Sequence, residues 1–228
     1  MLDSPVGVGF SEVGDASIPA SKEEEIEQLI QAVNSLTELH PGFKRRPVIV
    51  VGQSYGAVPA LEMARRRSHV SLHIVGLVLA APRLDLQVEL QHLSEAYYQF
   101  GLLTLTQSMQ VATDVGAVEA DVQKGYWKKA WRRRLALLEK LRRMAGVHTD
   151  ADPRRKSFYP VAEVRYQLQQ SNVRKALNVT SNVSWMSLSK DVFWAIGPDY
   201  LKPQTDIHQV YTCMYVCMHM HRRVYTHV

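Results

Sequence analysis

The sequence predicts an α/β fold in which helices flank a parallel sheet. Residues 48–51 and 74–80 are two apolar runs rich in valine, isoleucine and leucine, and such runs are typical of strands buried on both faces. Between them, residues 57–64 carry apolar side chains at roughly helical spacing. A strand, a helix and a second strand in this order form the unit that joins two parallel strands.

Residues 21–40 predict an amphipathic helix ahead of the first strand. Ser21 suits the N-cap position, and three glutamates follow in the first turn, where the helix dipole favours negative charge. The apolar stripe consists of Ile26, Leu29, Ile30, Val33, Leu36 and Leu39. Such a stripe indicates a helix with one side against a core.

Residues 52–56, Gly-Gln-Ser-Tyr-Gly, form a G-x-S-x-G motif between the first strand and the helix that follows. This is the context of a nucleophile elbow, in which the serine lies on a strained turn above the sheet. We expect both glycines to let the strand and the helix approach without a Cβ clash. The Ser54 hydroxyl would face the next backbone N–H and the helix N-terminus, and both favour a developing oxyanion. The alternative is a glycine-flanked turn without chemistry, because a reactive serine also needs a base and an acid.

Residues 86–178 lose the strand character and predict a helical insertion. Helices are expected at 88–100, 115–123, 128–144 and 173–177, with a polar, proline-containing linker at 148–160. The third of these has Trp131, Leu135, Leu138 and Leu141 on one face and arginines on the other. We interpret it as part of a lid rather than as a membrane-binding helix.

Asp85 follows the second predicted strand and has two possible roles. It could be a catalytic acid at the end of a strand. The interpretation that we favour is a cap for the next helix.

Composition excludes several classes of protein. The chain has 228 residues, of which 46% are hydrophobic and 21% charged, as in an ordinary globular protein. The net charge is +5, with arginine runs at 65–67, 132–134 and 142–143. We interpret these runs as solvated helix faces and expect no nucleic-acid partner, since no aromatic ladder or zinc spacing accompanies them. No apolar run approaches the ~18 residues of a membrane span, the N-terminus lacks a signal-peptide pattern, and no cofactor is expected.

The C-terminal tail, residues 210–228, draws on few residue types. Alternating pyrimidine–purine codons can encode all of them, so we interpret the tail as a translated dinucleotide repeat. Cys213 and Cys217, the two cysteines of the chain, lie here, so no disulfide framework holds the body. For the same reason we expect no metal site from these cysteines and the nearby His208, His219 and His221.

Asn178 and Asn182 each begin an N-x-[ST] pattern. They would accept N-linked glycans if the chain is secreted.

Several segments, in order, resemble one family. Asp-Ser-Pro-Val-Gly-Val-Gly-Phe-Ser at 3–11 and the motif at 52–56 are similar to segments of the serine carboxypeptidases, and residues 97–103, 172–177 and 199–207 add weaker matches. The resemblance implies an α/β-hydrolase fold with a helical lid. It also implies a peptidase of lysosomes, vacuoles or secretions that acts on the C-terminus of a peptide. The scarcity of cysteines and the lysine–proline segment at 202–203 bring the chain nearer to the retinoid-inducible branch than to the yeast or wheat enzymes of the family.

The resemblance also implies residue roles. Ser54 would be the nucleophile, and the backbone N–H of Tyr55 would be one donor of the oxyanion hole. Gln53 stands where the family usually has a glutamate that holds the terminal carboxylate of the substrate at acid pH. An amide can donate a hydrogen bond to a carboxylate at any pH, so the acid optimum of the family is not expected to carry over.

Two departures from the family lead us to expect a chain that is truncated at both ends and has little activity. The family's N-G-G-P-G loop precedes the segment that matches residues 3–11, and its catalytic aspartate and histidine follow the segment that matches residues 199–207. None of these is found. The expected segments are a partial hydrolase core with the elbow at 1–85, a helical lid at 86–170, a return to the core at 171–209 and the tail at 210–228. Two alternatives remain: a non-catalytic binding protein, or an esterase or lipase of the same fold with Asp85 as acid and a tail histidine as base.

Overall fold

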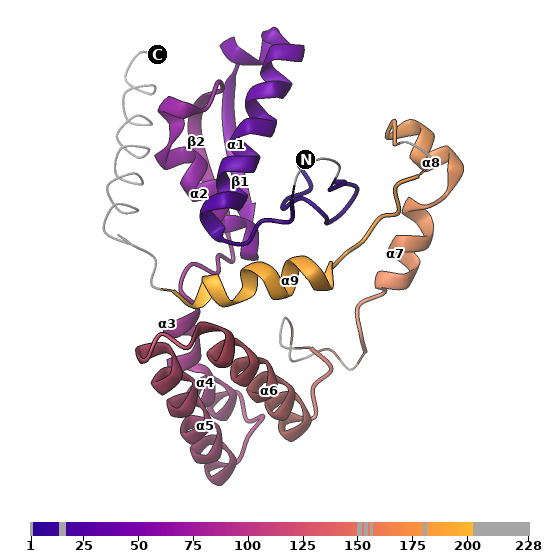
Figure 1. Ribbon diagram of the computed structural model, residues 1–228. Helices are drawn as coiled ribbons and strands as arrows, with labels where there is room; N and C mark the ends of the chain where they lie inside the picture. The colour runs from indigo at the N-terminus through magenta and orange to yellow at the C-terminus, as the bar shows by residue number, and fades with distance from the viewer. Residues whose placement is uncertain are drawn as a thin grey trace, which may run out of the picture. The chain divides into compact units, whose positions relative to one another are not determined.

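The computed structural model describes residues 2–13, 17–149, 152, 155, 157–179 and 182–202. The described chain divides into two compact units, and Figure 1 labels their helices and strands. The first unit contains residues 2–6 and 19–84, and the second contains residues 7–13, 17–18 and the described residues from 85 onward. The tail at 210–228, with Cys213 and Cys217, lies outside the described residues, as does His208. The segment boundaries expected at 85, 170 and 209 remain predictions.

The helix predicted at 21–40 is α1 (Lys22–Leu39). Its N-cap is Ser21, whose hydroxyl accepts a hydrogen bond from the Glu24 backbone N–H at 3.2 Å. The Glu24 carboxylate in turn accepts one from the Ala20 N–H at 2.8 Å. The buried apolar stripe ends at Val33, whereas Leu36 and Leu39 are exposed. The expected stripe is therefore longer than the buried face.

The predicted strand–helix–strand unit is confirmed. β1 (Pro47–Gln53) and β2 (His73–Ala80) pair in parallel, with Pro47 opposite His73 and Gln53 opposite Ala80. Between the strands lie the short 3-10 turn η2 (Ser54–Gly56), α2 (Ala57–Arg65) and the 3-10 turn η3 (Arg67–His69). A further 3-10 turn, η1 (Pro41–Arg45), joins α1 to β1. The order of elements brings the serine motif to the carboxyl end of β1.

The core of the first unit lies where α1 and α2 meet one face of the strands. Its buried members are Ile26, Ile30, Val33, Met63 and Val70, with Leu29, Leu72 and Ile74 packed against them. The expectation that both faces of the strands are buried is wrong for the described chain. Ile49 and Val51 are 61% and 64% exposed, while Val48 and Val50 are half-buried. Side chains alternate along a strand, so one face of β1 meets the helices and the other is open.

Four helices begin the second unit: α3 (Leu86–Gln91), α4 (Leu93–Gln99), α5 (Leu105–Gln123) and α6 (Trp127–Ala145). The single helix expected at 88–100 is two helices, with His92 between them. α5 begins well before the expected residue 115, because Thr104 and Gln107 form a capping box. α6 ends at Gly146, whose φ of +66° suits a residue without a Cβ.

The core of the second unit forms between α5, α6 and the chain that follows. Val111, Val115, Val118, Trp131, Leu138 and Leu141 are buried. α9 (Lys190–Ile196) leads into η4 (Gly197–Leu201), and a Cβ on Gly197 would lie 2.4 Å from Cε2 of Trp131. The ring centroids of Trp131 and Phe193 are 5.2 Å apart. Close packing of η4 on the indole therefore depends on glycine at this position.

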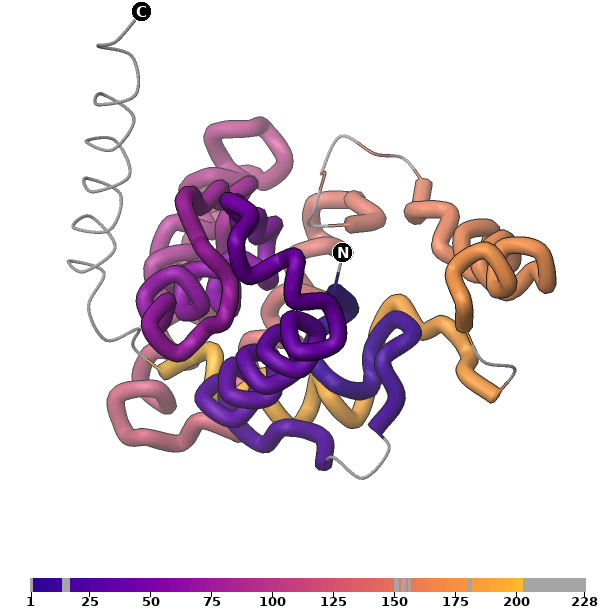
Figure 2. Tube along the Cα trace, turned by 90° about the horizontal axis from the view of Figure 1, so that it is seen from above, coloured from indigo at the N-terminus to yellow at the C-terminus, as the bar shows by residue number. Residues whose placement is uncertain are grey.

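The second unit also contains helices that the sequence pattern did not predict. α7 (Val161–Leu168) and α9 were missed, whereas α8 (Ser171–Ala176) corresponds to the helix expected at 173–177. α7 and α8 follow one another as a pair, orange in Figures 1 and 2. None of the described helices is both long enough and apolar enough to cross a membrane.

The apolar face of α6 packs within the second unit, but its arginine face differs from the prediction. Leu137 is buried and Leu135 only half-buried. Arg134 is buried against the Trp131 ring, and its Nη2 lies 4.0 Å from a Glu89 carboxylate oxygen. The expectation of a solvated arginine face is therefore wrong at this residue, because a guanidinium group can lie over the face of an aromatic ring.

Candidate active site

Ser54 occupies a tight turn between a strand and a helix. β1 ends at Gln53, η2 covers Ser54–Gly56, and α2 begins at Ala57. The φ angle of Ser54 is +52°, in the left-handed region that residues with a Cβ rarely adopt. The Ser54 side chain is exposed. Such strain in a non-glycine residue is concentrated at functional sites, where the surrounding structure maintains it.

The close approach of the strand and the helix at this turn depends on Gly52. A Cβ at residue 52 would lie 2.4 Å from the Gly56 carbonyl oxygen, 2.6 Å from Cβ of Ala60 and 2.7 Å from Cα of Ala57. At Gly56, in contrast, an added Cβ would have no atom within 4 Å, and the φ of this residue is −62°. The expected steric role of the two glycines is therefore found at Gly52 but not at Gly56.

Two hydrogen bonds hold the carbonyl group of Ser54. The backbone N–H of Arg83, beyond the end of β2, donates to it at 3.1 Å, and the N–H of Ala57 also donates to it. The peptide unit between Ser54 and Tyr55 is planar, so its N–H points away from its carbonyl oxygen. Fixing the carbonyl therefore constrains the direction of the Tyr55 N–H, the donor assigned from the resemblance to the oxyanion hole.

Tyr55 is held a second time through its side chain. Its hydroxyl donates a hydrogen bond to a carboxylate oxygen of Glu25 at 2.6 Å. Glu25 lies in the first turn of α1 and is only 1% exposed. Sequence reasoning missed this residue because the helix dipole already explained all three glutamates. The signal was its spacing, since Glu25 lies four residues before Leu29 and continues the apolar stripe.

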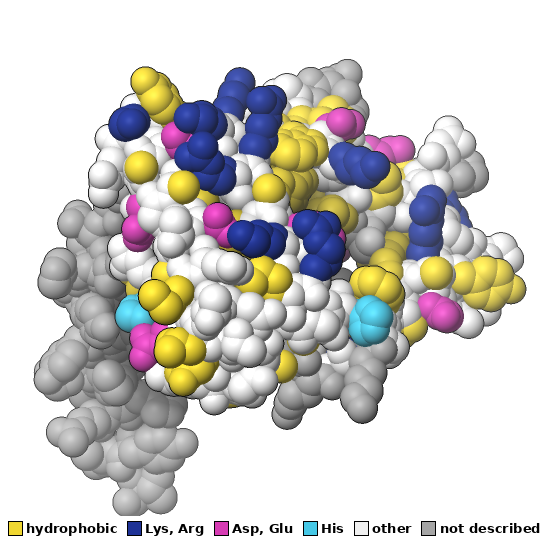
Figure 3. All heavy atoms as spheres, turned by 90° about the horizontal axis from the view of Figure 1, so that it is seen from below, with side chains coloured by type: hydrophobic (Ala, Val, Ile, Leu, Met, Phe, Trp, Pro, Cys, Tyr) yellow, Lys and Arg dark blue, Asp and Glu magenta, His cyan; other side chains and the backbone are white. Residues whose placement is uncertain are grey.

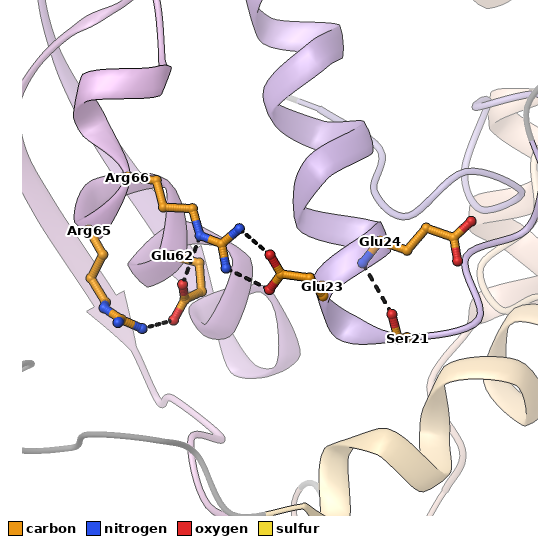
Figure 4. A network of polar contacts seen from close by, with 6 residues as sticks. All are labelled: Ser21, Glu23, Glu24, Glu62, Arg65 and Arg66. Carbon is orange, nitrogen blue, oxygen red and sulfur yellow. Dashed lines mark hydrogen bonds and ion pairs between the residues drawn. The ribbon is translucent and has the colours of Figure 1, made fainter.

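An ion-pair network joins α1 to α2 (Figure 4). Two guanidinium nitrogens of Arg66 contact the two carboxylate oxygens of Glu23 at 2.5 and 2.6 Å, and Arg66 also contacts Glu62. The hydrogen bond from Arg66 lowers the pKa of Glu23, and the same pair raises the pKa of Arg66. The network holds α1, which carries Glu25, against α2, which follows the turn at Ser54.

The other arginine runs are also paired with carboxylates. Arg133 contacts the buried Asp121 at 2.6 Å, and Arg142 and Arg143 contact Glu139. On the face drawn in Figure 3, Lys and Arg side chains are interspersed with acidic and hydrophobic ones. The expected absence of a nucleic-acid partner stays a prediction.

The remaining candidates from the sequence lie as follows. Gln53 is exposed and directly precedes Ser54. Asp85 is confirmed as a cap: its Oδ1 accepts hydrogen bonds from the N–H groups of Gln87 and Val88 at 2.9 and 3.2 Å. Asn178 is exposed at the end of α8 with φ +54°, and Asn182 is exposed after it.

Ligands for a metal ion do not cluster in the part of the chain that the structure describes. No group of three or more His, Cys, Asp or Glu side chains in those residues could hold one. The cysteines and histidines of the tail lie outside the described residues.

Comparison with known proteins matches residues 1–215 to a family model described as serine carboxypeptidase. "Serine carboxypeptidase-like 50" of Arabidopsis thaliana is 28% identical over 209 residues, which cover 88% of this chain and 46% of that protein. "Vitellogenic carboxypeptidase" of Aedes aegypti is 28% identical over 136 residues, which cover 58% of this chain and 29% of that protein. "Serine carboxypeptidase S10 family member 1" of Dictyostelium discoideum is 21% identical over 212 residues, or 87% of this chain and 51% of that protein.

The chain thus spans about half, or less, of the length of these relatives. Their names do not separate the branches of the family, so similarity to the retinoid-inducible branch stays a prediction. The fold of the family is the α/β-hydrolase fold, and the parallel strands with their flanking helices are a part of it. The family model covers most of the chain, including the strained turn at Ser54, and the chain therefore belongs to the serine carboxypeptidase family.

Proposed function

We propose that Ser54 is the nucleophile of a serine-type carboxypeptidase, which releases the C-terminal residue of a peptide through an acyl-enzyme. The observation that carries this proposal is the exposed Ser54 at φ +52° between β1 and α2, with Gly52 permitting the close approach. A serine in this position lies beside backbone N–H groups at the start of a helix, which favour negative charge.

The reaction would be an acyl transfer in two steps. The Ser54 hydroxyl oxygen attacks the last peptide carbonyl carbon while a general base takes the hydroxyl proton. The oxyanion that forms accepts a hydrogen bond from the Tyr55 N–H, and the C–N bond then breaks as the amine takes the proton. Water hydrolyses the resulting ester and restores Ser54.

Gln53 would orient the substrate. Its side-chain amide N–H would donate a hydrogen bond to the terminal carboxylate of the peptide. Because an amide does not titrate, this contact would persist at neutral pH. The carboxyl group usual at this position in the family must be protonated to do the same.

The 228-residue chain by itself would hydrolyse peptides weakly or not at all. A serine of this type needs a base and an orienting acid, and neither is assigned to a residue of the described chain. Loss of one triad member typically lowers the rate by several orders of magnitude. The route through the cell would be the secretory one, ending in a lysosome or vacuole or outside the cell, with glycans on Asn178 and Asn182.

A fluorophosphonate probe tests the nucleophile, since a single turnover is detectable even when hydrolysis is slow. We expect slow labelling of the peptide that contains Ser54, abolished in Ser54→Ala and retained in Ser68→Ala, which alters an exposed serine of η3. Labelling that persists in Ser54→Ala would contradict the assignment. A chain that melts cooperatively but is never labelled would instead be a binding protein.

Competition against the same probe separates a carboxypeptidase from an esterase. A peptide with a free terminal carboxylate should slow the labelling more than its C-terminal amide does, and Gln53→Ala should remove the difference. Equal competition by the two peptides in the wild-type chain would favour an esterase or lipase.

A further inference from the structure

Glu25 is an acidic side chain at a buried position of α1 that would suit an apolar one. It is 1% exposed and lies on α1 beside Ile26, with Ile30 and Val33 further along the same buried face. Burying an ionised carboxylate is unfavourable unless hydrogen bonds compensate it. A leucine of similar size would complete the apolar stripe without this cost, so packing alone does not account for a glutamate here.

The contact of Glu25 with Tyr55 has the geometry of a strong hydrogen bond. The 2.6 Å between the tyrosine hydroxyl and the carboxylate oxygen falls in the range of a charge-assisted O–H···O⁻ bond. The bond joins the first turn of α1 to the residue after Ser54, 30 positions away in the sequence. Tyr55 is only half-buried, so burial alone does not fix its ring. The hydrogen bond to Glu25 adds a constraint from α1.

The peptide unit between Ser54 and Tyr55 is thereby held at both ends. At the Ser54 end, the carbonyl oxygen accepts from the N–H groups of Arg83 and Ala57. At the Tyr55 end, the side chain is tied to Glu25. The Tyr55 N–H lies opposite the carbonyl in the peptide plane, so its direction follows from how the two ends are held.

We propose that Glu25 is a positioning residue for the reaction at Ser54: through the Tyr55 hydroxyl it holds the Tyr55 N–H in the direction of the oxyanion. This inference rests on the proposed function. In this role Glu25 acts through Tyr55 and not on the reacting atoms. Its effect is on the rate of the chemical step, because a misdirected donor stabilises the oxyanion less.

The test measures fluorophosphonate labelling of Ser54 in the full chain, with the limiting rate kinact separated from the probe affinity KI. The variants are Tyr55→Phe, which removes only the hydroxyl, Glu25→Leu, and the two combined. Glu27→Gln alters an exposed glutamate of the same helix and is the matched control. Thermal unfolding of each variant gives the folded fraction by which the labelled amount is normalised.

We expect Tyr55→Phe and Glu25→Leu each to lower kinact about tenfold, with KI unchanged, less than the 10²–10³-fold loss when an oxyanion donor is removed outright. The double variant should be no slower than the slower single one, because both changes remove the same bond. Glu25→Leu should melt at or above the wild-type temperature, since leucine avoids the buried charge. If Glu25 had only a structural role, its substitution would lower the melting temperature and leave kinact of the folded fraction unchanged.

Two failures are distinguishable. Wild-type kinact in both single variants overturns the role of Glu25 and leaves the proposed function standing. A wild-type chain that is folded but not labelled at Ser54 overturns the proposed function and, with it, this inference.

Discussion

Gly52 lies where β1 passes closest to α2, and a side chain there would have no room. Its Cβ would meet backbone and Cβ atoms of Gly56, Ala57 and Ala60, none of which can rotate away. Gly56 follows Ser54 at the other end of the motif, and a methyl group there would meet open space. Within one motif, Gly52 is therefore required for close packing, whereas Gly56 is not.

Gly52→Ala should therefore lower the free energy of unfolding by about 1–3 kcal/mol, the usual cost of overpacking. Gly56→Ala, at a φ of −62°, should be neutral or raise it by about 0.4–1 kcal/mol through the unfolded state. Urea unfolding of the two variants measures both values. An unchanged free energy of unfolding in Gly52→Ala would mean that the strand and the helix are further apart than described.

The three glutamates at the start of α1 show where sequence reasoning stops. All three suit the first turn of a helix, and the pattern assigns them one role. In the structure Glu23 pairs with Arg66, Glu24 accepts from the Ala20 N–H, and Glu25 is buried against Tyr55. The turn at Ser54 was predictable because its constraints are local. The partners of Glu23 and Glu25 were not, because they depend on how α1 packs against the rest of the unit.

Between elements, the contact of Glu23 with Arg66 joins α1 to α2. The pKa of Glu23 is lowered from its ordinary 4.5, with the Arg66 hydrogen bond as the largest cause. Because the pKa of Glu23 is lower in the folded chain, the pair contributes its full stabilisation at pH values above the ordinary pKa. This contribution is lost as the pH falls through the lowered pKa of the folded chain.

Glu23→Gln should lower the free energy of unfolding by no more than about 1 kcal/mol at pH 7, because the pair is near the surface and screened by solvent. At about pH 2 the difference between the variant and the wild type should be smaller, because Glu23 loses its charge as the pH falls through its lowered pKa. Urea unfolding at both pH values gives the comparison, with Glu38→Gln on the exposed side of α1 as control. A loss that is the same at both pH values would show that the charge of Glu23 is not its cause.

The errors in predicting helices have physical causes. α5 was predicted too short because its first turns carry polar side chains, and the capping box at Thr104 and Gln107 was not recognised. α9 is only seven residues long, too short for a clear periodicity. Charge alone predicts a solvated face for Arg134, whereas its guanidinium carbon lies 5.4 Å from the centroid of the Trp131 ring.

Taken as a whole, the described chain leaves apolar strand surface open. Ile49, Val51 and Val78 are exposed on the described sheet, although their sequence is that of buried strands. Strand identity was predictable from composition. Burial was not, because it depends on what covers the second face, and α1 and α2 account for one face only.

The proposed secretory route makes a prediction for the whole protein. Expressed through a secretory pathway, the chain should carry glycans that a peptide N-glycosidase removes, seen as a mass shift. Ser184→Ala should remove the glycan on the exposed Asn182, and Thr180→Ala the one on Asn178, while Ser181→Ala leaves both acceptor patterns intact. An unchanged mass after secretion would contradict the assignment of both acceptors.

The contact between Gly197 and Trp131 gives the second unit an optical reporter. The indole is 5% exposed and lies against η4, with Phe193 of α9 beside it. An indole in apolar surroundings emits at shorter wavelength than one in water. Separation of α9 and η4 from α6 would therefore shift the fluorescence of Trp131 to the red, and the attachment of these elements can be followed without any added dye.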